Sequence, residues 1–252
     1  MQSITRYGRT RKPESVNREL AILSGIFRMA VDYDEIPQNP CRKVQLLPEN
    51  NQRTRHLSFE EEHRLFAEMT GKRDYLQPLV TVALYAGPRR GELLKLRWAN
   101  VDFDLNTITF KETKTNKDRS VPMEPIVRTA LLKLRENADD AEYVFVNPDT
   151  GTRYTDVKKS FSAACRQAGI TDFRFHDLRH TFGTRLADAG VDVMKIKELM
   201  GHASIVTTMR YIHATDQGKR GAIVVLSEYR QRHCRKFVAK EKRQTVQPAA
   251  SR

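Results

Sequence analysis

The sequence holds few cysteines, the residues that crosslink small domains and form zinc knuckles. Three of its 252 residues are cysteines, Cys41, Cys165 and Cys234, and they lie far apart. A disulfide framework uses an even number of cysteines, and a zinc knuckle places two of them close together. The chain also has no GxxxxGK[ST] nucleotide loop and no carboxylate cluster at metal spacing. We therefore expect reduced thiols and no metal or other cofactor.

Long apolar runs are missing as well. The longest, residues 79–87 and 222–226, are far shorter than the ~18 residues that a membrane-spanning helix needs. The first twelve residues carry four cationic side chains but no apolar stretch before a small-residue cleavage site. That pattern argues against a secretory signal. We expect a cytoplasmic protein.

Positive charge is what the chain has in excess. Its 44 lysines and arginines outnumber its 31 aspartates and glutamates, which gives a formal net charge of +13. A polyanion is the obvious partner. Ribosomal and membrane-surface proteins are also basic, so the charge favours nucleic acid but says nothing about chemistry.

Changes in composition divide the chain. Residues 15–34 place apolar side chains at three- and four-residue steps, as in one amphipathic helix. Residues 48–56 have no period and almost no apolar residue, which is typical of a solvated linker. From Leu226 onward the net charge is +6. We predict an N-terminal helical domain, a linker, a main domain and a basic tail, at residues 1–49, 50–57, 58–225 and 226–252.

Local signals make the main domain mainly α with a small three-stranded antiparallel sheet. Ser58 and Glu61 form a capping box that begins a helix at residues 59–71. Short β-forming runs separated by turn residues predict antiparallel strands at 101–103, 107–110 and 119–121. Apolar periodicity and glycine stops predict further helices at residues 76–85, 91–97, 125–136, 157–168, 177–189 and 193–200.

Two motifs with basic residues lie in turns. Arg89 and Arg90 stand in a glycine- and proline-rich bend at the head of a helix, where an arginine can meet an anion beside free backbone amides. Lys114 lies at a tight turn between two predicted strands, where it could reach a partner's groove and deliver a proton. Taken alone, each segment is better explained as a solvated surface turn.

Two further motifs lie nearer the C-terminus. His176 and Arg179 are three residues apart on one helix and share a neighbouring face. There the guanidinium can clamp two phosphoryl oxygens while the imidazole handles a proton. His202 follows a glycine helix stop, and Tyr211 lies nine residues further on. A lone tyrosine is usually core or interface, so the order of the whole set is what indicates a catalytic site.

This ordered set resembles the tyrosine recombinase (phage integrase) family. Residues 86–93 fit that family's Thr-Gly-x-Arg-x-x-Glu-Leu box, with Ala86 in place of the threonine. Lys114 fits its Thr-Lys-Thr turn, and its His-x-x-Arg and Leu-Gly-His boxes are matched, with Met200 in place of the leucine. The resemblance implies a catalytic set of Arg89, Lys114, His176, Arg179, His202 and Tyr211.

In that family the tyrosine oxygen attacks a DNA phosphodiester and leaves a 3′-phosphotyrosyl link, which stores the bond without a metal. The resemblance, which covers residues 15–212, implies that the two arginines neutralise the phosphorane. It further implies that His176 is the base and that Lys114 protonates the departing 5′ oxygen. His202 would hold a phosphate oxygen. Glu92 is better explained as a structural residue that braces an arginine.

The partner that the resemblance implies is double-stranded DNA in the nucleoid, with four protomers on two sites and a monomer possible without DNA. Family members carry a helical DNA-clamping domain of about 100 residues ahead of the catalytic domain. Residues 1–49 resemble only its second half. We therefore expect a truncated product or a fragment, or a chain whose missing half comes from elsewhere. In each case we expect it to keep its chemistry but to have weakened DNA affinity and site selectivity.

Two other functions share these features. A type IB topoisomerase forms the same link but reseals the same strand, although the short spacing from His202 to Tyr211 resembles recombinases more. A non-catalytic DNA-binding module would keep Tyr211 in its core. The basic tail is either a solvated arm or a DNA contact that adds salt-sensitive affinity.

Overall fold

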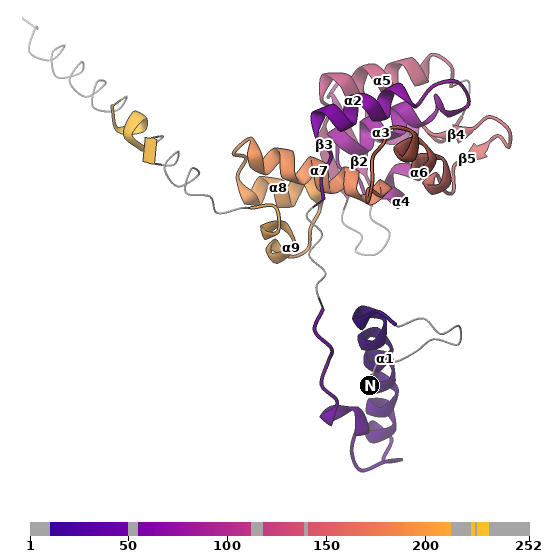
Figure 1. Cartoon of the computed structure of the whole chain (residues 1–252). Helices are drawn as coiled ribbons and strands as arrows, with labels where there is room; N and C mark the ends of the chain where they lie inside the picture. Colours follow the sequence, from indigo (N-terminus) through magenta and orange to yellow (C-terminus); the bar gives the residue numbers. More distant parts are fainter. Residues whose placement is uncertain are drawn as a thin grey trace, which may run out of the picture. The chain divides into compact units, whose positions relative to one another are not determined.

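The computed structural model describes residues 11–49, 55–111, 118–138, 141–212, 223–224 and 226–231. The chain divides into two compact units, Met1–Arg53 and Thr54–Arg252 (Figure 1). Across the described ranges, every helix is too short or too polar to cross a bilayer. The assignment of residues 1–49 to a DNA-clamping domain stays a prediction.

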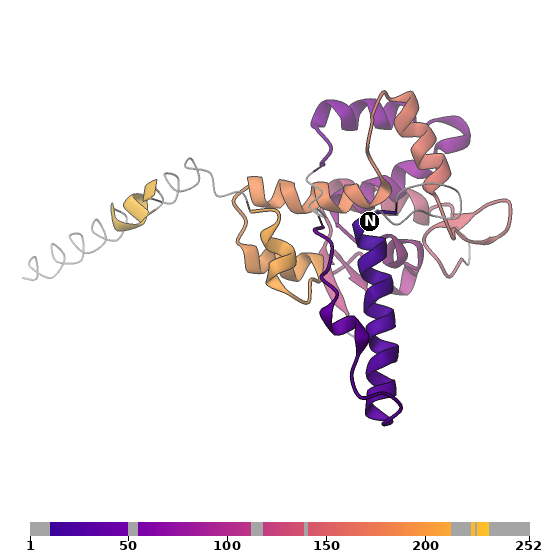
Figure 2. The ribbon, with the colours of Figure 1, turned by 60° about the horizontal axis from the view of Figure 1, so that its bottom comes forward.

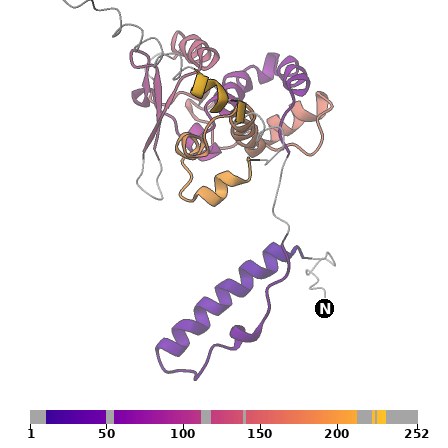
Figure 3. The ribbon, with the colours of Figure 1, turned by 90° about the vertical axis from the view of Figure 1, so that its left-hand side faces the viewer.

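The N-terminal unit is a long helix with the chain returning beside it, as Figure 3 shows. The helix α1, Pro13–Asp32, begins with a proline, whose fixed φ suits a first turn. Its buried Asn17 amide donates to the Leu47 carbonyl at 2.8 Å and accepts from the Leu47 amide at 2.9 Å. These bonds attach the returning chain, which includes the short 3-10 helix Pro40–Lys43, to α1.

The larger unit is built around α3, Leu76–Tyr85, in which seven residues are buried. Apolar side chains on nearly every face of α3 let it serve as a central helix. It packs against α5, Pro125–Arg135, and α7, Phe175–Asp188. This central helix is where the hydrophobic core sits.

The predicted capping box is confirmed at the start of α2, Phe59–Ala67. The Ser58 hydroxyl accepts from the Glu61 amide at 3.2 Å, and the Glu61 carboxylate accepts from the Ser58 amide at 3.1 Å. The helix ends before the predicted glycine stop, because Gly71 belongs to a separate 3-10 turn, Gly71–Arg73.

The predicted three-stranded antiparallel meander is also confirmed. The strands β1, Val101–Asp102, β2, Thr107–Phe110, and β3, Arg119–Pro122, pair in the order β1-β2-β3. Ile108 pairs with Val121, and both side chains are buried. The alternation of inward- and outward-facing side chains along each strand fixes which face of the sheet covers the core.

Two further local features differ from the prediction. The helix α4, Arg90–Leu94, is shorter than the predicted 91–97, because the Leu96 carbonyl instead accepts from the Val144 amide at 2.9 Å. That tertiary pairing overrides the helical pattern. A second small sheet, Val146–Asn147 with Thr152–Arg153 (β4 and β5), was not predicted, since two-residue strands carry no alternation.

The C-terminal part of the larger unit carries the helices that follow the sheets. The helix α6, Lys158–Gln167, precedes α7, and α8, Val193–Met200, follows it. Gly201, at φ +63°, adopts the left-handed conformation that ends α8, as the glycine stop predicted. Figure 2 shows α8 beside α7, and the short α9, Ile205–Met209, packs against α8.

Candidate active site

Arg89 stands at the N-cap of α4, where residues 86–93 bend. Gly87 at φ +63° makes the bend, and a Cβ there would lie 2.2 Å from the Phe182 ring, so only glycine fits. The Arg89 amide donates to Glu92 at 2.9 Å, and its Nη1 donates to the other Glu92 oxygen at 2.7 Å. The Arg89 side chain stays about one-third exposed, at 36%, and can meet an incoming anion.

Glu92 is the structural residue that the sequence indicated. Its carboxylate is 7% exposed and also receives Arg119 Nη1 at 2.8 Å. Burial tends to raise the pKa of this carboxyl, but Arg119 and Arg89 outweigh burial and hold the pKa below its ordinary value. Glu92 therefore stays ionised between two arginines and fixes both.

Arg119 is a site residue that sequence reasoning missed. It lies at the start of β3, two residues from the buried Val121, so the alternation of the strand turns it toward the core. Its Nε donates to the Leu199 carbonyl at 3.0 Å, and its guanidinium lies 4.9 Å from the Phe110 ring centroid. An arginine on the core-facing side of a predicted strand was the signal that could have found it.

Arg179 is 4% exposed and lies on α7. Its guanidinium donates to the Gly87 carbonyl at 2.7 Å and to the Met200 carbonyl. Burial, and then the neighbouring Arg119 and Arg89, lower the pKa of Arg179 to about 10. The group is still charged at neutral pH, and it links the Arg89 bend to the end of α8.

His202 follows Gly201 directly and points off the end of α8. Its Nδ1 lies 2.9 Å from the Thr208 hydroxyl, and its ring is stacked on Tyr211 with centroids 6.2 Å apart and planes at 10°. Burial, and then Arg179, lower the pKa of His202 to about 3. This imidazole is neutral at neutral pH.

Tyr211 lies just past α9 and is 5% exposed. Its hydroxyl lies 2.9 Å from Nδ1 of His180, a residue that the predicted set does not include. Burial raises the pKa of Tyr211, and Arg179 and Arg210 partly oppose it. His180 stands four residues after His176 on one helix, and that spacing was the only sequence signal for it.

The remaining two predicted residues are His176 and Lys114. His176, at the start of α7, is only partly exposed, and its ring meets the His180 ring edge-on with centroids 5.1 Å apart. Burial, and then Arg179, lower its pKa. Lys114 falls outside the described residues, so its place and role stay predictions.

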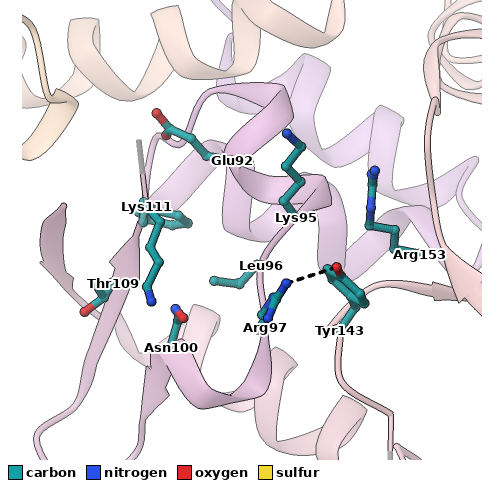
Figure 4. Close-up of a pocket in the computed structure, with 10 residues that line it drawn as sticks. Glu92, Lys95, Leu96, Arg97, Asn100, Thr109, Lys111, Tyr143 and Arg153 are labelled. Carbon is teal, nitrogen blue, oxygen red and sulfur yellow. Dashed lines mark hydrogen bonds between the residues drawn. The ribbon is translucent and has the colours of Figure 1, made fainter. Parts of the chain in front are cut away.

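A basic cavity of about 470 Å³ adjoins Glu92 on the side of β2. Figure 4 shows Lys95, Lys111 and Arg153 around it. Arg97 extends toward the Tyr143 hydroxyl at 3.4 Å. Within the described ranges, no cluster of three histidine, cysteine or carboxylate side chains could hold a metal ion.

The phage integrase family model matches residues 55–218, a span that contains the sheet, the arginines, the histidines and Tyr211. The chain belongs to the phage integrase family. The predicted family, fold class and enzyme class, a site-specific DNA recombinase of the tyrosine type, are therefore confirmed.

Individual relatives agree with this assignment. The chain is 29% identical over 223 residues to the tyrosine recombinase XerC of Pediococcus pentosaceus, covering 81% of this chain and 72% of that one. It is 32% identical over 210 residues to the shufflon-specific DNA recombinase of Escherichia coli, covering 81% of this chain but only 53% of that protein. The fold matches a DNA-bound Tn1549 transposon integrase with a TM-score of 0.72 at 22% identity, covering 85% and 79% of the two chains.

Proposed function

We propose that this chain cuts and rejoins double-stranded DNA at specific sites through a covalent bond between Tyr211 and a 3′-phosphate. The observation that carries the proposal is the convergence of Arg89, Arg179 and His202 around the end of α8, next to a buried Tyr211. These residues come from separate elements, and a merely structural tyrosine would not need the charge of Arg179 and a stacked imidazole beside it.

In the cleavage step the Tyr211 oxygen forms a bond to phosphorus, and the bond from phosphorus to the 5′ oxygen breaks. The phosphorane carries extra negative charge, which Arg89 and Arg179 meet as fixed donors in a largely buried site. Preorganised donors of this kind need no rearrangement as the charge develops. This advantage explains why hydrogen bonds fix both arginines before DNA binds.

Two protons must move in the same step. The phenol proton needs an acceptor, and His176 is suited to this because its lowered pKa keeps it neutral at neutral pH. The departing 5′ oxygen needs a donor, for which Lys114 remains the candidate. His202 can donate from Nε2 to a phosphate oxygen if Nδ1 accepts from the Thr208 hydroxyl at 2.9 Å.

The DNA duplex also needs contacts away from the reacting phosphate. We assign some of them to the basic cavity, where Lys95 and Lys111 can meet backbone phosphates. Strand exchange by a four-protomer complex on two DNA sites in the cytoplasm completes the proposal.

A nicked suicide substrate tests the function. Wild type should form an adduct that survives denaturation, and Tyr211→Phe should form none while binding DNA equally well. Identical behaviour of the two proteins would assign a non-catalytic DNA-binding module. Closure of one nicked plasmid without joint molecules would assign the topoisomerase reaction instead.

A further inference from the structure

One histidine outside the predicted catalytic set contacts the proposed nucleophile. His180 lies on α7 beside Arg179 and is 9% exposed. Its Nδ1 lies 2.9 Å from the Tyr211 hydroxyl, and the two ring centroids are 5.8 Å apart. His202 directs its own Nδ1 to Thr208 instead.

The Tyr211 ring is confined on two sides, and its hydroxyl contacts His180. The His202 ring is stacked on it with planes at 10°. On α7, a Cβ added at Gly183 would lie 3.0 Å from Tyr211 Cε2 and Cζ and 2.8 Å from Met200 Sδ. The absence of a side chain at Gly183 lets the phenol lie against the helix.

Protonation states decide which atom donates in this pair. Burial, and then His176, lower the pKa of His180 to about 4, and Arg210 and Arg179 act in the same direction against Asp177. Burial raises the pKa of Tyr211 above its ordinary value of 10.0. At neutral pH a neutral imidazole therefore faces a protonated phenol, and the phenol can donate to Nδ1 if the ring proton is on Nε2.

The same values indicate the resting state of the pair. Tyr211 holds its proton more tightly than an ordinary phenol, whereas His180 releases its own near pH 4. In the resting chain the proton therefore stays on the oxygen, and the phenol is the donor of the hydrogen bond.

We propose that His180 is a positioning residue for the nucleophile: by accepting a hydrogen bond from Tyr211 at Nδ1, it sets the orientation in which the phenol oxygen meets the phosphate. The proposal rests on the proposed function. Orientation matters because a misplacement of about 1 Å in a reacting group can slow a reaction about 100-fold.

Two variants separate positioning from packing. His180→Asn keeps an acceptor near the place of Nδ1, whereas His180→Leu keeps apolar volume and removes the acceptor. In single-turnover adduct formation at saturating suicide substrate, we expect His180→Leu to be about 10- to 100-fold slower, with unchanged DNA affinity. His180→Asn should stay within a few-fold of wild type. Equal rates for wild type and His180→Leu, or equal losses in both variants, would overturn the proposal.

A measurement without turnover guards against a variant that fails to fold. In the full chain with ¹⁵N-labelled histidine, NMR should show His180 neutral down to about pH 5 as the Nε2–H tautomer, with that preference reduced in Tyr211→Phe. An Nδ1–H tautomer would contradict the hydrogen bond. If wild type itself forms no adduct, the proposed function fails and the pair is only structural; if wild type forms the adduct and His180→Leu matches it, only the positioning role fails.

Discussion

The anion-facing half of the site and its nucleophile half are held by different interactions. Arg89 and Arg119 are fixed by ion pairs to Glu92 at 2.7 and 2.8 Å. Tyr211 and His180 are instead a neutral pair, because burial raises the pKa of the phenol and lowers that of the imidazole to about 4. Charge is thus present before DNA arrives where the proposed phosphorane would form, while the oxygen of the proposed nucleophile stays protonated.

The two halves meet at the end of α8. Arg119, Arg179 and Arg89 donate to three successive carbonyls, those of Leu199, Met200 and Gly201. The last carbonyls of a helix have no partners inside it and carry partial negative charge, which cations stabilise. The arginines thereby fix the chain segment that leads into His202, so disturbing one half should disturb the other to a measurable degree.

The largest effect should come from Glu92→Ala, which leaves Arg119 buried without its carboxylate. Removing one partner of a buried ion pair costs about 3–5 kcal/mol. We expect the free energy of unfolding, measured by denaturant titration, to fall by about that amount. Glu92→Gln, which keeps the shape, should lose less, and equal losses would contradict the ionic explanation.

The same carboxyl predicts a pH dependence. The folded pKa of Glu92 lies below its ordinary value of 4.5. Its contribution to stability should be fully present above that ordinary value and should be lost as the pH falls through the lower folded value. The stability gap between wild type and Glu92→Gln should therefore close on acidification. A gap that stays constant down to pH 3 would show that Glu92 is not ionised in the folded chain.

Arg89→Ala should act mainly on chemistry. Removing one preorganised donor to a developing anion costs about 100- to 1,000-fold in rate. We expect that loss in single-turnover adduct formation at saturating DNA, with Arg89→Lys intermediate because it retains charge without the fork. A loss confined to DNA affinity would assign Arg89 to binding alone.

Gly183→Ala should have a smaller effect on the nucleophile half. The new Cβ would press on Tyr211 and Met200, and overpacking of this kind costs about 1–3 kcal/mol. Adduct formation should slow as the phenol shifts. Gly91→Ala, a helical glycine with no atom within 4 Å of its would-be Cβ, controls for helix propensity and should not destabilise the chain. Equal stability of the two variants would contradict the close packing at Gly183.

The smallest effect belongs to the basic cavity. Replacing Lys95 and Lys111 by glutamine should weaken DNA binding a few-fold and reduce the slope of log affinity against log salt by about one per lysine. Adduct formation at saturating DNA should be unchanged. An unaltered salt slope would exclude the cavity from the DNA surface.

Much of the fold could be predicted from local pattern. Neighbouring residues alone predict the capping box at Ser58, the meander strands and the glycine end of α8. The end of α4 could not be predicted in this way, because Leu96 leaves the helix to pair with Val144, which is distant in sequence. Local helix propensity carries no information about a hydrogen-bond partner so far along the chain.

For this protein the sequence by itself determined the family, the fold class and the order of the arginines, histidines and tyrosine, because those depend on residue type and spacing. Only the tertiary structure decided that Arg119 shares Glu92 with Arg89 and that His180 contacts the Tyr211 hydroxyl. Both contacts join residues from different elements. Their energies depend on burial and on the distance between the contacting atoms, and both are defined only in the folded chain.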